Sequence, residues 1–198
     1  MSAVALRAHS LAEAYLYLMA TPCAACGKGP LRGGDAVRVG TGPVLIMRID
    51  AVCAACHGPR QLHFQLTQGL GTTGTGAPAV VNASDEPSEI IDVAQWITLA
   101  RVIAEAAGRE TNKGRARHLG LEAAQCFEEA LKFFEDFNDV PPQSAFLLES
   151  SRQHFREHPE QFSRQRLVER RAKLPSTQAM RARIAHAPKR RWWPFGKR

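Results

Sequence analysis

Apolar residues follow two different patterns along this chain, and the change falls near residue 90. Before it, short apolar runs at 36–39 and 44–49 flank a Gly- and Pro-containing turn, and 61–66 alternates polar with apolar residues. These patterns are typical of β-strands. After it, apolar residues recur every three or four positions, as in amphipathic helices. The sequence therefore predicts an α+β chain, with a small sheet followed by an all-α helical bundle.

One helix is expected before the strands, at residues 10–20. Ser10 stands where an N-cap is needed, with Glu13 three residues later, which is the spacing of a capping box. Pro22 ends the helix. A small sheet has little core of its own, so we expect this helix to buttress it through one apolar face made of Leu11, Tyr15, Leu18 and Met19.

Start and stop signals divide the second half into four helices. We expect them at 92–108, at 113–136, from Ser144 onward and from Pro159 onward. Asp92 with Gln95 forms a second capping box at the start of the first of these helices. Because the connections are short, the helices should pack antiparallel into a bundle over 89–174.

The most specific chemical signal is a pair of identical motifs, Cys23-Ala-Ala-Cys26 and Cys53-Ala-Ala-Cys56. Two residues between cysteines let both sulfur atoms point into one turn. Two such turns brought together place four thiolates at the corners of a tetrahedron, the geometry of a structural zinc site. Such a site has no open coordination position, so it stabilises a fold and does not act on a substrate.

The order cysteine pair, two strands, cysteine pair and strand resembles a zinc ribbon. The resemblance covers residues 20–68 only. It implies a structural zinc ion with Cys23, Cys26, Cys53 and Cys56 as the ligands.

The cysteines allow three other interpretations. Cys53-Ala-Ala-Cys56-His57 matches the c-type haem attachment motif, but that attachment requires export, and charged residues interrupt the apolar part of residues 1–22. A redox dithiol lacks the surrounding βαβ pattern, and disulfides are disfavoured without a secretion signal. Zinc is the favoured reading, and a cytoplasmic location is expected. His57 and His63 are interpreted as surface residues.

Residues 68–88 are expected to form a Gly/Thr-rich linker. Gly69, Gly71 and Gly74 match a dinucleotide-binding fingerprint, but no helix pattern opens at its end to present amides to a pyrophosphate. The predicted organisation is an N-terminal helix with the ribbon at 1–67, the linker at 68–88, the bundle at 89–174 and a tail at 175–198.

Two features of the helical half are interpreted as structural. Cys126 stands alone in an apolar stripe and is expected to be buried. The acidic residues between 128 and 139 have no Glu-x-x-His pattern and are interpreted as a solvated face. No nucleophile–base pair is visible, so the chain is not expected to be an enzyme.

Charge is concentrated at the C-terminal end. The net charge is +7, made of a balance of −4 over residues 1–150 and +11 over 151–198. The last eleven residues mix cations with aromatic rings, a combination that binds unpaired nucleic-acid bases and phosphates and that also suits an anionic membrane surface. The expected partner-binding residues are Lys189, Arg190, Arg191, Trp192, Trp193, Phe195, Lys197 and Arg198.

Together these patterns predict a non-enzymatic zinc-binding adaptor with nucleic acid as the favoured partner. A protein–protein adaptor and a peripheral membrane-surface protein tethered by the basic tail remain the alternatives. A c-type haem protein through Cys53, Cys56 and His57 is the most remote of them.

Overall fold

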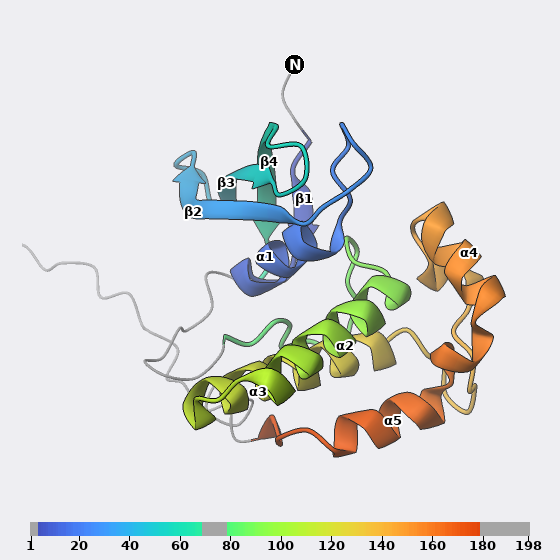
Figure 1. Ribbon diagram of the computed structural model, residues 1–198. Coiled ribbons are helices and arrows are strands. Elements are labelled where there is room, and N and C mark those ends of the chain that lie inside the picture. The colour runs from blue at the N-terminus through green and yellow to red at the C-terminus, as the bar shows by residue number, and fades with distance from the viewer. Residues whose placement is uncertain (1–3, 69–78, 179–198) are drawn as a thin grey trace, which may run out of the picture.

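The computed structural model describes residues 4–68 and 79–178. Figure 1 shows a sheet at one end of the molecule, α1 beneath it and the α2–α3 pair below α1, with α4 at the right beside the upper end of α2 and α5 below the pair. The elements are β1 (Leu6–Ala8), α1 (Leu11–Ala20), β2 (Leu31–Val39), β3 (Leu45–Cys53), β4 (Pro59–Leu66), α2 (Val93–Arg109), α3 (Lys113–Leu131), α4 (Glu149–Glu157) and α5 (Arg164–Ala172). The α+β class predicted from the sequence is confirmed over these residues.

The sheet has four strands in the order β1-β4-β3-β2. The three predicted strands overlap β2, β3 and β4, which pair antiparallel, and all three are longer than expected. β1 was not predicted. It pairs parallel to β4, with Leu6 opposite Phe64. Three residues are too few to show an alternating pattern, so only pairing with β4 defines this strand.

The face of the sheet that carries Met47, Ile49 and Phe64 is buried under α1. The helix comes very close at Gly33 of β2, where an added Cβ would lie 2.6 Å from Leu18 Cδ1. Glycine is therefore needed at this position for close approach. Packing of Leu18 on the sheet is confirmed. The prediction for Met19 is wrong, because its side chain is 46% exposed at the end of α1.

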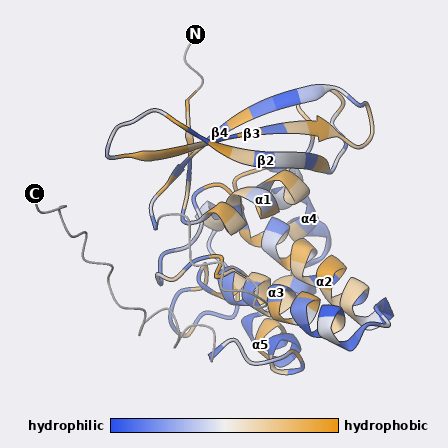
Figure 2. Cartoon of the chain, turned by 90° about the vertical axis from the view of Figure 1, so that its left-hand side faces the viewer, coloured by the Kyte–Doolittle hydropathy of each residue, from blue (hydrophilic) through white to orange (hydrophobic). Residues whose placement is uncertain are grey.

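The helices differ from their predicted bounds mainly at their ends. The capping box of Asp92 and Gln95 is present at the start of α2, where Trp96 is fully buried. α3 ends at Leu131, five residues early. The expected third and fourth helices begin as the 3₁₀ turns Gln143–Ala145 and Pro159–Phe162, and α4 and α5 follow these turns. Figure 2 shows hydrophobic and hydrophilic residues on each of the long helices, as amphipathic packing requires.

Residues 79–92, which precede α2, form a packed segment. Val81 and Ile91 are buried, and the Ser10 hydroxyl donates to the Val81 carbonyl oxygen over 2.6 Å. One hydrophobic core continues from the sheet through this segment into the helices. The predicted division into a ribbon, a linker and a bundle stays a prediction. The glycine-rich part of the linker at 69–78 lies outside the described residues.

None of the helices in the described parts of the chain is both long and apolar enough to span a bilayer. The predicted partner-binding residues of the tail, from Lys189 to Arg198, lie outside the described residues, as does everything after 178.

Candidate metal centre

The four predicted ligands converge. The Sγ atoms of Cys23, Cys26, Cys53 and Cys56 all lie within 4.8 Å of one another. Cys23 Sγ is 3.9 Å from Cys56 Sγ, and Cys26 Sγ is 3.7 Å from Cys53 Sγ. A tetrahedral zinc ion with bonds of about 2.3 Å requires sulfur–sulfur separations of about 3.8 Å. The spacing of the sulfurs therefore fits a metal ion.

Both cysteine pairs adopt the same backbone turn. In the first turn, the Gly27 amide donates to the Cys23 carbonyl oxygen and the Cys23 amide donates to the Lys28 carbonyl oxygen. In the second turn, His57 and Gly58 repeat these two bonds with Cys53. Gly27 and His57, at equivalent positions, have φ angles of 67° and 57°. The left-handed conformation suits glycine, so His57 is under local strain that Gly27 avoids.

The sheet holds the two turns beside each other. Leu31 at the start of β2 is paired with Cys53 at the end of β3. The Ala54 amide then donates to the Pro30 carbonyl oxygen over 2.9 Å, which links the two turns directly. Antiparallel pairing of β2 with β3 thus brings together motifs that lie thirty residues apart in the sequence.

Backbone amides make the turns receptive to thiolates. The Ala25 amide, together with that of Cys26, lowers the pKa of the Cys23 thiol to about 6. The amides of Cys56 and Ala55 lower the pKa of Cys53 in the same way, and the Ala55 amide lies 3.4 Å from Cys53 Sγ. Thiolate is the form that binds metal, so these amides prepare both turns for a cation.

Three further residues, Lys28, Arg60 and His57, lie near the four sulfur atoms. The Lys28 amide lowers the pKa of Cys26, but burial and the neighbouring sulfurs raise it more, to about 11, so this thiol needs the metal to ionise. Arg60 Nη2 lies 3.5 Å from Cys23 Sγ and supplies positive charge beside the cluster. His57 is exposed and occupies the turn position of Gly27. With all four sulfurs in one cluster, the site is closed and has the donor set of a structural metal ion.

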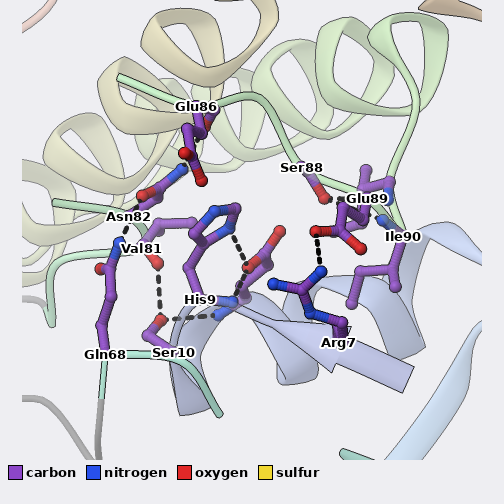
Figure 3. Close-up of polar contacts among 12 residues, drawn as sticks. Arg7, His9, Ser10, Gln68, Val81, Asn82, Glu86, Ser88, Glu89 and Ile90 are labelled. Carbon is purple, nitrogen blue, oxygen red and sulfur yellow. Dashed lines mark hydrogen bonds and ion pairs between the residues drawn. The ribbon is translucent and has the colours of Figure 1, made fainter. Parts of the chain in front are cut away.

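A second polar cluster was missed by the sequence analysis. We call it the buried charge cluster: His9 after β1, Glu13 in α1, Asn82 in the packed segment, and Glu129 and Lys132 at the end of α3. Glu13 accepts hydrogen bonds from the His9 amide and lies 3.0 Å from His9 Nδ1. Asn82 Nδ2 donates to Glu129 over 3.1 Å, and Lys132 Nζ donates to Glu129 over 2.7 Å. Part of this network is drawn in Figure 3.

The buried charge cluster corrects two expectations. The acidic run was interpreted as a solvated face, but Glu129 is only 1% exposed. Glu13 was expected to close a capping box on Ser10, and the Ser10 hydroxyl does accept from the Glu13 amide. The Glu13 carboxylate instead reaches one residue further, to His9. No pattern in the sequence marks these residues, because they come from segments that lie far apart in the chain, near residues 9, 13, 82 and 130.

Burial shifts the protonation of this cluster. The hydrogen bond with Glu13 raises the pKa of His9, although burial opposes it. Burial raises the pKa of Glu129 to about 6, against the opposing effects of Lys132 and Asn82. The Oε1 atom of Glu13 is buried and makes no hydrogen bond to a described residue. A protonated His9 therefore stabilises Glu13 in the folded protein.

Cys126 is fully buried in α3, as predicted, and burial raises its pKa well above the ordinary value. It takes no part in the metal cluster.

Comparison with known proteins gives no relatives: no family model, no curated protein and no solved structure matches this chain.

Proposed function

We propose that this chain is a non-enzymatic zinc-binding adaptor whose favoured partner is nucleic acid. The observation that carries the proposal is the closed cluster of four cysteine sulfurs at tetrahedral spacing. Four thiolates select zinc or iron among the common metals, and zinc is the usual occupant of two paired turns on a small sheet. When bound, zinc would cross-link the two turns and supply structural stability.

The residues around the site support a structural role. Cys23 and Cys53 are buried, and the sheet pairs the segments that carry them. Four protein ligands leave no position for water or substrate on the ion. The metal would thus fix one end of β2 and β3, on the side of the molecule away from α5.

The partner part of the proposal rests on charge. Within the described residues, α5 carries Arg164, Arg166 and Arg170, none of which forms an ion pair with a described carboxylate. The chain continues from α5 into the most basic part of the sequence. Several cations on one continuous segment attract phosphates and release counterions, which gives binding that weakens as salt rises.

The zinc part is tested by elemental analysis of protein purified without chelator. We expect one zinc per chain, and the Cys56→Ser variant should lose it while the Cys126→Ala variant keeps it. Iron, or no metal in the wild-type protein, would contradict the proposal.

The partner part is tested by titrating labelled single-stranded DNA and RNA with the full chain at several salt concentrations. We expect binding at low salt that weakens steeply as salt rises. Replacing Arg190 and Arg191 with Ala should reduce the salt dependence, whereas replacing Trp192 and Trp193 with Ala should weaken binding at every salt concentration. Absence of binding at low salt would favour the protein–protein adaptor, and preference for anionic vesicles would favour the membrane-surface reading.

A further inference from the structure

A cavity of about 390 Å³ lies where α1 and Pro30 meet α2 and α4. Three elements form it: the end of α1 with Pro30, the first turns of α2, and the start of α4. Its apolar wall contains Met19, Pro30, Leu99 and Val102. Met19 and Val102 are 46% and 57% exposed, so two large apolar side chains face open space here. The volume falls in the range of small-molecule sites.

The polar side chains on the α2 wall of the cavity already make hydrogen bonds within the described part of the protein, unlike those on the α4 wall. On the α2 side, Gln95 accepts from the Asp92 amide and donates one of its two Nε2 hydrogens to the Ala20 carbonyl oxygen. The Thr98 hydroxyl donates to the Ala94 carbonyl oxygen of its own helix. Only the second Nε2 hydrogen of Gln95 is left as a donor on this side, so the α2 wall offers a ligand mainly apolar contact.

The α4 side differs. Ser150, Ser151 and His154 line the cavity from one face of this helix. Their side chains make no hydrogen bond to any described residue. Ser151 lines the cavity and is 95% buried, so little bulk water competes for its hydroxyl. Hydroxyl and imidazole groups can all donate, and the lining contains no carboxylate that would repel an anion.

We propose that this cavity binds a small amphipathic carboxylate, with an alkyl or aromatic body against Met19, Leu99 and Val102 and the carboxylate toward Ser151 and His154. The apolar wall excludes a fully polar ligand, and the absence of a lining carboxylate gives no counter-charge for a cationic head. The proposal does not depend on the nucleic-acid partner.

The experiment titrates full-length protein labelled with ¹³C at the methionine methyl groups with octanoate, octanol and octylamine. Met19 lines the cavity, while Met47 lies on the buried face of β3 and serves as the internal reference. We expect a saturable shift of the Met19 signal with octanoate at a Kd of about 0.1–1 mM, weaker binding of octanol, and little binding of octylamine. The Met47 signal should not move.

Two variants complete the test. Val102→Trp fills the cavity from an exposed position and should abolish the Met19 shift, whereas Val37→Trp, at a similarly exposed position on β2, should not. Ser151→Ala should weaken octanoate about tenfold and octanol less, because a hydrogen bond to a charged group is the stronger one. Equal affinity for all three compounds, or no Met19 shift at about 10 mM of any of them, would overturn the proposal.

Discussion

The metal centre and the buried charge cluster both hold distant parts of the chain together with polar groups, yet they do so differently. The metal centre takes its four ligands from two short turns of identical sequence, and each turn positions its own sulfurs through local amide bonds. The buried charge cluster takes one or two groups from each of four segments, and its charges balance one another without an ion from outside. The stability of the metal centre therefore depends on the supply of metal, and the stability of the buried charge cluster depends on pH and packing.

The largest effect is expected at the metal centre. Cys53→Ser removes a buried ligand, and because the free energy of metal binding is free energy of folding in such modules, residues 23–66 should lose stable structure. The amide signals of β2 to β4 should collapse in a two-dimensional NMR spectrum, and a strong chelator should produce the same loss in the wild-type protein.

Cys126→Ala is the matched control, since it removes a buried thiol outside the cluster. It should retain the metal and the sheet signals and cost only about 1 kcal/mol. A folded, metal-free Cys53→Ser protein would show that the sheet stands without the ion, and the contrast between the two regions would then disappear.

The next effect concerns the ion pair of the buried charge cluster. Lys132→Met leaves Glu129 buried without its cation and should lower the free energy of unfolding by about 3 kcal/mol, measured by urea denaturation. Adding Glu129→Leu should recover much of this loss, because both charges are then gone. Arg109→Met removes a cation from the exposed pair with Glu105 and should change stability by less than about 0.5 kcal/mol. Equal losses for Lys132→Met and Arg109→Met would contradict burial of the cluster.

The pH dependence of the buried charge cluster should be smaller still. Glu129 has a raised pKa of about 6, so the folded state binds its proton more readily and this group contributes stability that decreases as pH rises from about 4.5 to 6. His9 also has a raised pKa, so its contribution is complete below 6.5 and is lost as pH rises through its folded value. Both pKa shifts make the folded protein more stable in mild acid. The charged groups that face them are Glu13 beside His9 and Lys132 beside Glu129.

The measurement compares urea denaturation of the wild-type and Glu129→Gln proteins between pH 4.5 and pH 8. The difference in free energy of unfolding between the two proteins should change by about 2 kcal/mol across the lower part of this range. His9→Gln should remove a further dependence at higher pH. A constant difference between wild type and Glu129→Gln would show that Glu129 keeps an ordinary pKa.

The smallest change in stability is expected from substitutions in the two turns of the metal centre. His57→Gly relieves the left-handed strain at φ 57° and should raise the free energy of unfolding by at most about 1 kcal/mol, without loss of metal. Gly27→Ala introduces the same strain in the first turn and should lower it by about 1 kcal/mol. Thermal unfolding of the metal-loaded proteins measures both changes. If the two turns are equivalent, the stability changes of His57→Gly and Gly27→Ala must have opposite signs.

The sequence by itself determined the elements that depend on neighbours in the chain. The cysteine pairs, the Ser10 and Asp92 caps, the three longer strands and the burial of Cys126 all follow from spacing over a few residues, and the structure confirms them. It could not predict β1, whose three residues become a strand only by pairing with β4. It also did not show that Met19 would face away from the sheet.

Only the tertiary structure decided which polar residues are buried. His9, Glu13 and Lys132 look like ordinary surface residues in the sequence, and Glu129 stands in an acidic run. They meet because one core joins the sheet, the segment after residue 78 and α3. The same packing leaves a cavity between α1, α2 and α4. Burial depends on contacts between segments far apart in the chain, and a single sequence carries local preferences far more clearly than those contacts.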